Sequence, residues 1–161
     1  MPSGEDGSLA APEDAYALPI CGELEYGDGF NVNGIVATDA GLVVVHSGEG
    51  QLYRIDPMTG DAVLVDIGDA SVSNGDGLEL DGRNLYVVRN QLNQVATYEL
   101  AEDAASATLV AETTSDDFEV PTTAALVGDD LWAVNARFGI EVDPETEYWI
   151  TRLDAAGTMD G

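Results

Sequence analysis

The sequence predicts an all-β protein built from β-propeller blades, and three observations support this. From residue 31 onward the chain consists of short runs rich in Val, Leu, Ile, Thr and Tyr, separated by Gly, Asp, Asn and Pro turn signals. None of these runs has the 3.6-residue period of an amphipathic helix. Leu42, Leu85 and Leu131, which begin three similar apolar runs, lie 43 and 46 residues apart. A period in the forties with four strands per repeat is typical of propeller blades.

The expected strands form three sets along the chain. Each set has an inner strand, an apolar second strand, a third strand and an outer strand, although the last set lacks its outer strand. The strands are 34–38, 41–46, 51–56 and 62–67, then 77–80, 84–89, 94–100 and 107–113, then 122–127, 131–135 and 148–153. They predict blades near 33–67, 76–113 and 121–153. Three blades are fewer than the roughly four to eight of a closed propeller, so a half-propeller is expected.

The predicted propeller part covers residues 15–154, with shorter segments on either side. Residues 1–14 read as an acidic flexible arm, and 155–161 as a flexible tail. A strand-like run at 15–20 contains Pro19, so it is expected at a sheet edge or a strand end. The N-terminal arm has neither the basic region nor the apolar core of a signal peptide.

Charge narrows the range of partners. The chain has 31 acidic and 5 basic residues, all five of them arginine, and a net charge of −26. Nucleic acid and anionic membrane are therefore excluded as expected partners, because binding phosphates requires clustered cations. No apolar run approaches the roughly 18 residues of a membrane span. Cys21 is the only cysteine, which excludes an intrachain disulfide.

Salt is expected to stabilise the fold. Repulsion among the uncompensated carboxylates opposes the compact state, and dissolved ions screen it over about 10 Å at 0.1 M and about 3 Å at 1 M. The midpoint of thermal unfolding should therefore rise between about 0.1 and 1 M NaCl. Choline chloride should raise it equally at the same ionic strength, because screening does not depend on which cation is present. A midpoint that neither salt raises would contradict this expectation.

Three stretches resemble a known family. They are "NGIVATDAGLVVVHSGEGQLYRIDPMTGDAVLVDIG", "SNGDGLELDGRNLYVVRNQLNQVATYEL" and "VPTTAALVGDDLWAVNARFG". They resemble blades of the senescence-marker-protein/gluconolactonase/strictosidine-synthase-like superfamily of six-bladed propellers. In that family an Asn-Gly opens a strand, and a Tyr-Arg-Xaa-Asp-Pro-Xaa-Thr-Gly turn follows. The resemblance covers roughly residues 18–153 and implies about three of the six blades, the C-terminal half.

The resemblance also implies a metal site and a reaction. In the family a divalent cation, often calcium, lies at the channel mouth, held by a Glu and an Asn of the first half and an Asn and an Asp of the second. Asn33 matches the second-half Asn, and Asp76 matches the second-half Asp. Amide and carboxylate oxygens are hard ligands that suit calcium. The implied function is a metal-dependent, lactonase-like hydrolase acting on a small-molecule substrate, with Asp76 also the candidate catalytic base. Without the first-half ligands, this chain alone is expected to be inactive.

Other interpretations stay open from the residues themselves. Asn33 and Asn74 each precede a glycine and also suit turns, while Asp76 also suits a solvated turn. The alternative function is a non-catalytic propeller module that binds a ligand or a protein at the channel mouth. A half-propeller leaves blade faces unpaired, which predicts self-association, as a two-fold dimer that completes six blades, or a missing N-terminal half.

His46, the only histidine, is expected near the surface at a strand end. Its neighbour Ser47 points to the opposite face of the strand, so the two cannot form a nucleophile–base pair. Arg137 is expected in an ion pair with an acid of the neighbouring blade rather than on an anionic substrate. The aromatic residues expected to pack between blades are Tyr86, Trp132 and Trp149.

Overall fold

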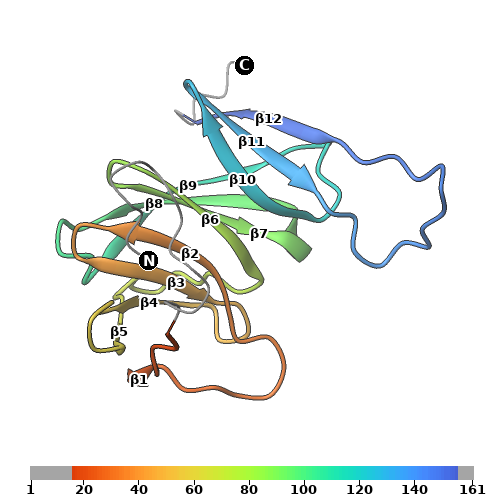
Figure 1. Ribbon diagram of the computed structural model, residues 1–161. Helices are drawn as coiled ribbons and strands as arrows, with labels where there is room; N and C mark the ends of the chain where they lie inside the picture. The colour runs from red at the N-terminus through yellow and green to blue at the C-terminus, as the bar shows by residue number, and fades with distance from the viewer. Residues whose placement is uncertain (1–15, 156–161) are drawn as a thin grey trace, which may run out of the picture.

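The computed structural model describes residues 16–155, and its regular structure is almost entirely β-strand (Figure 1). The first sheet holds β2 (Val32–Thr38), β3 (Gly41–His46), β4 (Gln51–Ile55) and β5 (Asp61–Leu64); the second holds β6 (Gly75–Asp81), β7 (Asn84–Arg89), β8 (Gln94–Leu100) and β9 (Ala107–Thr114); the third holds β10 (Pro121–Val127), β11 (Asp130–Asn135) and β12 (Ile150–Asp154). One 3-10 turn, η2 (Asn90–Leu92), is the exception within this range. The all-β prediction is confirmed.

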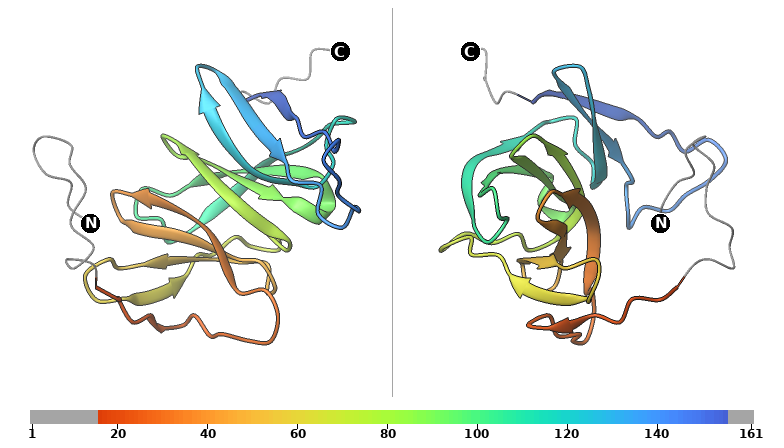
Figure 2. Two further views of the ribbon diagram at one scale, coloured as in Figure 1. Left: turned by 45° about the vertical axis from the view of Figure 1, so that its right-hand side comes forward. Right: turned by 60° about the vertical axis from the view of Figure 1, so that its left-hand side comes forward.

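Each sheet is an antiparallel meander, and the three sheets stack side by side in chain order (Figure 2). The third has three strands, as expected. The first gains a short fifth strand, β1 (Cys21–Gly22), which runs parallel to β5. The strand expected at 15–20 is not found in its described part, residues 16–20. Since Pro19 has no N–H, the pairing begins only after it, where Cys21 N donates to the carbonyl of Gly60 (3.0 Å).

Every inner strand begins with the same irregularity. The ladder shifts register between Val32 and Ile35, between Gly75 and Leu78, and between Pro121 and Thr123. Asn33, Asp76 and Thr122 lie within these shifts, at equivalent positions of the three blades. A β-bulge redirects side chains away from regular pairing. The bulges therefore bring these three residues to the same end of their sheets.

Two glycines allow neighbouring inner strands to approach closely. A Cβ added at Gly34 would lie 2.3 Å from the carbonyl oxygen of Asp76 and 2.7 Å from the amide nitrogen of Leu78. A Cβ at Gly77 would lie 2.7 Å from the Cα of Thr123. Neither glycine has a positive φ, so neither is required by a left-handed turn. Asn33-Gly34 is therefore a strand head pressed against the next blade, and not a hairpin turn.

The core consists of apolar layers between the sheets. The second strand of the middle blade shows how they form, because its side chains alternate between two faces. Leu85 and Val87 pack toward the first sheet, and Tyr86 and Val88 pack toward the third. This confirms the prediction that Tyr86 packs between blades.

Several details of the third blade differ from expectation. Trp132 remains 36% exposed on the face that points away from the second sheet, so it does not lie between blades in the described range. Trp149 lies just before β12 and not within it. Ala155, assigned to the tail, is anchored, since its N–H donates to Asp129 O (3.2 Å) and its carbonyl accepts from the Tyr86 hydroxyl (3.1 Å). The predicted arm and residues 156–161 of the predicted tail lie outside the described residues.

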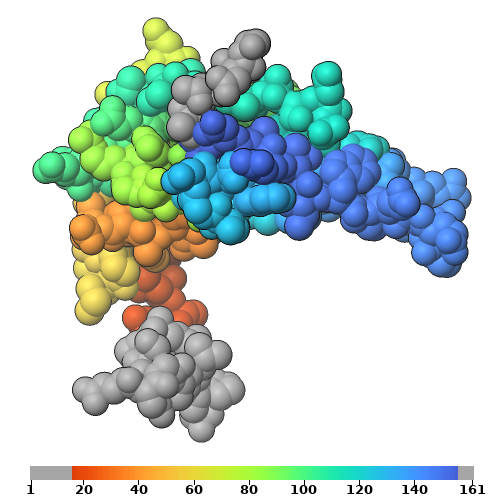
Figure 3. Space-filling view, turned by 90° about the horizontal axis from the view of Figure 1, so that it is seen from above, coloured from red at the N-terminus to blue at the C-terminus, as the bar shows by residue number. Residues whose placement is uncertain are grey.

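Over the described residues, no helix is long and apolar enough to cross a membrane. The long connection from β11 to β12, residues 136–149, extends away from the stacked sheets (Figures 1 and 3).

Candidate functional site

A cavity of about 510 Å³ opens where the three inner strands begin. We call it the mouth cavity. Both predicted site residues, Asn33 and Asp76, line it, together with residues from all three blades and their connections. The lining consists of Phe30, Asn33, Ser47, Gly48, Ser73, Asn74, Asp76, Asn90, Gln91, Thr122 and Phe138.

Asp76 is held rigidly in this cavity. Its side chain is largely buried, with only 8% of the residue exposed. Asn90 Nδ2 donates to its Oδ2 at 2.9 Å, and Thr122 Oγ1 donates to the same oxygen at 2.7 Å. Oδ1 accepts no hydrogen bond from residues 16–155. Two blades therefore orient the carboxylate through one oxygen and leave the other available to a ligand.

Asn33 and Asn74 add amide groups to the same cavity. Asn74 has a left-handed backbone (φ 60°), so the turn expected at Asn74-Gly75 is present. Its N–H donates to Ser47 O (3.1 Å), and its carbonyl accepts from Asn90 N (3.0 Å). Neither asparagine side chain makes a hydrogen bond to residues 16–155, so both amides are available to a ligand.

The donor set fits a hard cation in type but not in number. One carboxylate, Asp76, and four side-chain amides, those of Asn33, Asn74, Asn90 and Gln91, line the cavity, and calcium prefers oxygen ligands. Calcium takes about 6–8 oxygens, so other groups must complete any such site. Within the described part of the chain there is no cluster of three or more His, Cys, Asp or Glu side chains able to hold a metal ion.

The second strand of each blade ends in a buried polar residue. His46, Arg89 and Asn135 pair with the first residues of the inner strands and are only 2%, 8% and 0% exposed. The expectation that His46 lies near the surface is therefore wrong. The chain encloses the strand end, because Ser47 N and Gly48 N donate to the carbonyls of Asn31 and Phe30.

The His46 ring lies beside a small polar group in the first blade. Its Nδ1 accepts from Glu49 N at 3.2 Å, while its buried Nε2 has no hydrogen-bond partner among the described residues. The Tyr53 ring lies 6.5 Å away, and its hydroxyl donates to Gln51 Oε1 at 2.7 Å. Burial, with a contribution from the Glu49 carboxylate, raises the pKa of Tyr53 to about 12, so this hydroxyl remains a donor at neutral pH.

Arg89 fixes one wall of the mouth cavity. Its guanidinium donates to Ser73 O and Ser73 Oγ, both at 3.1 Å, to Gln94 Oε1 at 2.8 Å and to Glu112 Oε1 at 2.9 Å. Asn135 acts similarly one blade later, where its Oδ1 accepts from Glu119 N at 2.8 Å. Sequence reasoning missed both residues. The available signal was their spacing, since His46, Arg89 and Asn135 repeat at the same intervals as the leucines.

Arg137 forms an ion pair, as expected, although its partner lies in a connection and not on a strand of the neighbouring blade. Its Nε lies 3.0 Å from Glu119 Oε2, and its guanidinium carbon lies 4.9 Å from the centre of the Trp149 ring. Glu119 belongs to the connection between the second and third blades. Arg137 therefore braces the long β11–β12 connection, and its neighbour Phe138 lines the mouth cavity.

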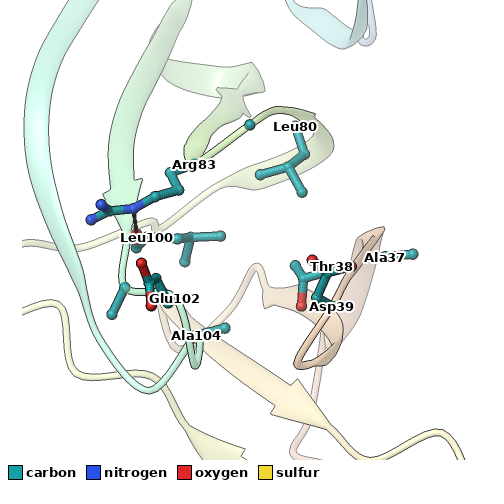
Figure 4. A pocket seen from close by; sticks show the side chains of 10 residues that line it. Ala37, Thr38, Asp39, Leu80, Arg83, Leu100, Glu102 and Ala104 are labelled. Atoms are coloured by element: carbon teal, nitrogen blue, oxygen red, sulfur yellow. Dashed lines mark hydrogen bonds between the residues drawn. The ribbon is translucent and has the colours of Figure 1, made fainter.

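A second cavity, of about 600 Å³, lies at the opposite ends of β2 and β6 (Figure 4). The Arg83 side chain beside it is already engaged, through Nε to Leu100 O (2.7 Å) and through an ion pair with Glu99 (3.1 Å). The exposed carboxylate of Asp39 also lines this cavity. Neither of the predicted site residues is among its lining, so Asp39 provides a control position for the mouth cavity.

Comparison with known proteins informs the fold alone. No protein-family profile matches the chain, and no curated protein sequence matches it. The N-terminal domain of Nup159, a β-propeller, is similar in structure, with a TM-score of 0.50 and 15% identity over 75% of this chain and 33% of that domain. A functionally unknown protein from Desulfotomaculum acetoxidans DSM 771 gives a TM-score of 0.47 and 18% identity, over 65% of this chain and 35% of that one.

The chain thus spans about a third of the length of both solved structures. Three meander sheets stacked in chain order, with apolar layers between them, agree with the propeller likeness. The chain is an all-β protein with the fold of a partial β-propeller.

Proposed function

We propose that the mouth cavity binds a divalent cation, calcium, together with a small-molecule lactone, as part of a lactonase-like hydrolase. The observation that carries the proposal is the Asp76 carboxylate, whose Oδ2 is tied to Asn90 and Thr122 while Oδ1 has no donor among residues 16–155. Asn33 lines the same cavity with an amide free of hydrogen bonds to the described residues. The family resemblance adds the reaction class.

The roles of the chain's own residues follow from this arrangement. Asp76 and Asn33 would hold the cation through Oδ1 and the amide oxygen. When bound, calcium supplies Lewis-acid polarisation of a lactone carbonyl. Asn90 and Thr122 keep the carboxylate in one orientation, so Asp76 needs no rearrangement to act. A lone pair of Oδ1 that does not hold the cation could accept a proton from an attacking water, because Oδ2 already accepts two hydrogen bonds.

Calcium titration calorimetry tests the site. Asp76→Asn should weaken calcium binding at least about tenfold, because the cavity loses the one carboxylate that the described residues place in it, while an amide oxygen still accepts from Asn90 and Thr122. Asp39→Asn is the matched control, since it removes one exposed carboxylate from the opposite end of the sheets. About 0.5 M NaCl in the cell suppresses diffuse attraction of calcium to the acidic surface. Equal heats from wild type and Asp76→Asn would refute the assignment.

A non-catalytic binding module is the second candidate. It is favoured by the small number of carboxylate ligands, because Asp76 is the only carboxylate among residues 16–155 that lines the mouth cavity. The two candidates differ in turnover. Saturable calcium or lactone binding without lactone hydrolysis above the uncatalysed rate would support the binding module. Hydrolysis that is lost in Asp76→Asn and kept in Asp39→Asn would support the hydrolase.

A further inference from the structure

Two exposed phenylalanines line the mouth cavity. Phe30 lies in the segment before β2 and is 82% exposed, and Phe138 lies in the β11–β12 connection and is 56% exposed. Large apolar side chains that are exposed beside a cavity are typical of a ligand-binding site, because a bound ligand removes them from water. We call Phe30 and Phe138 the rim phenylalanines.

Hydrogen bonds fix the backbone of Phe30. Its carbonyl accepts from Gly48 N at 3.1 Å, and the side chain of the next residue, Asn31, closes the preceding loop by donating from Nδ2 to Gly29 O at 2.9 Å. A side chain at Gly48 would prevent this contact, since its Cβ would lie 2.5 Å from Phe30 O. Phe30 is therefore exposed but lies in an ordered segment.

Phe138 is held in a similar way from the third blade. Its neighbour Arg137 donates from the backbone N to Glu119 O at 3.2 Å and from Nη1 to Glu147 O at 2.7 Å, in addition to its ion pair with Glu119. These bonds join the two ends of the long β11–β12 connection. A segment that is already ordered loses little further freedom when a ligand binds, which favours binding.

The hydroxyl groups of the cavity already have hydrogen-bond partners. Ser47 Oγ and Thr122 Oγ1 both donate to β6, and Ser73 Oγ accepts from Arg89. Both polar atoms of the Asn90 side-chain amide are bonded as well. Much of the polar lining therefore serves the protein itself.

Few polar groups of the cavity remain for a ligand. The side chains of Asn33, Asn74 and Gln91 and the Oδ1 of Asp76 have no hydrogen-bond partner among residues 16–155, and Asn33 and Asp76 are assigned to the cation in the proposed function. Each hydroxyl of a polyhydroxylated ring needs a partner when it leaves water, and two amides cannot supply them all. An anionic ligand is disfavoured too, because Asp76 carries the only charge that the described residues place in the lining.

We propose that the mouth cavity selects a neutral lactone with an aryl substituent, whose ring carbonyl faces Asp76 and whose aryl group packs against the rim phenylalanines. The lactone part of this inference rests on the proposed function, whereas the aryl contact needs no calcium. An aryl group suits aromatic partners, because paired rings gain more than their buried area alone provides. Phe30 and Phe138 are specificity-determining residues in this arrangement and take no part in the chemistry.

NMR titration of the full chain with two ketones tests the aryl contact. Cyclopentanone and 3-phenylcyclopentanone copy the ring carbonyl of a lactone without and with an aryl group, and neither can be hydrolysed. The phenyl ketone should bind at least about tenfold tighter, equally in calcium and in EDTA. Equal affinities for the two ketones would overturn the inference, as would tighter binding of glucose, a neutral polyhydroxylated ring. No saturable binding of the phenyl ketone up to about 10 mM would overturn it as well.

Matched aromatic variants locate the contact. Phe30→Ala and Phe138→Ala should each weaken binding of the phenyl ketone by about fivefold or more and leave that of cyclopentanone unchanged. Tyr26→Ala and Tyr148→Ala are the controls, because these rings are 66% and 57% exposed in the same two segments but do not line the cavity. Equal losses from the phenylalanine and tyrosine variants would contradict the assignment, as would phenylalanine variants that bind like wild type.

The aryl contact and the proposed function fail separately. An aryl preference that depends on Phe30 and Phe138, in a protein whose calcium heats are the same with and without Asp76, would refute the calcium site and support the contact. Calcium heats that depend on Asp76, without an aryl preference, would refute the contact alone.

Discussion

Gly34→Ala is expected to lower the free energy of unfolding by about 3 kcal/mol or more. The added Cβ would lie 2.3 Å from Asp76 O and 2.7 Å from Leu78 N. Both atoms are backbone, so no side-chain rotation can relieve the clash, and the two inner strands must separate. Separation would also shift Asp76, which should weaken binding in the mouth cavity together with stability. Urea denaturation in about 1 M NaCl measures the change, and a thermal midpoint lower by about 6–12 °C should accompany it.

Gly27→Ala is the matched control for this clash. A Cβ at Gly27 would meet no atom within 4 Å, and its φ is not positive. The same substitution should therefore change stability by less than about 0.5 kcal/mol. If Gly34→Ala and Gly27→Ala unfold at the same urea concentration, the close approach of the inner strands contributes nothing to the free energy of unfolding.

Arg89→Met should destabilise the protein by about 2–4 kcal/mol. The substitution keeps a long apolar side chain in place but removes every donor that satisfies Ser73 O, Ser73 Oγ and Gln94. The estimate is below that for a fully buried pair, because the partner carboxylate of Glu112 is 44% exposed and water can solvate it. Since Ser73 lines the mouth cavity, calcium affinity should fall as well.

Arg83→Met is the control, because Arg83, in the turn between β6 and β7, also pairs with a glutamate but does so at the surface. It pairs with Glu99 at 3.1 Å, and both side chains are 53% exposed. Its loss should cost no more than about 1 kcal/mol. Equal losses from the two arginines would mean that burial of Arg89 contributes nothing.

Most of the fold was predictable because blades repeat. Alternation of apolar residues marks each strand, and the spacing of Leu42, Leu85 and Leu131 reveals the repeat without reference to a contact. The wrong predictions concern residues whose environment is set by other segments of the chain, about which the local sequence pattern carries no information. The burial of Trp132 depends on whether another sheet covers it. Strand pairing next to Pro19 depends on where β5 lies.

The candidate site was predictable only in part. The resemblance indicated Asn33 and Asp76, and the structure brings both into one cavity, while their roles as ligands remain a proposal. The environment of Asp76 could not be foreseen, because Thr122 is 46 residues away and on another blade. The burial of His46 and Arg89 was missed for a similar reason. Polar residues at strand ends usually face water. His46 and Arg89 are buried only because segments from elsewhere in the chain pack over the ends of their strands.

The amino-acid sequence was sufficient to predict the strands, the blades and the acidic character of the protein. Strands and blades follow from the pattern of apolar residues along the chain, and the acidic character follows from the numbers of acidic and basic residues. The tertiary structure decided which oxygen of Asp76 accepts no hydrogen bond from the described residues, and that Asn33-Gly34 is a strand head pressed against the next blade. It also decided that the apolar residues of the third blade that face away from the second sheet are not covered by any other residue in the range 16–155. These properties arise between blades, where groups more than forty residues apart meet at distances that no local pattern encodes.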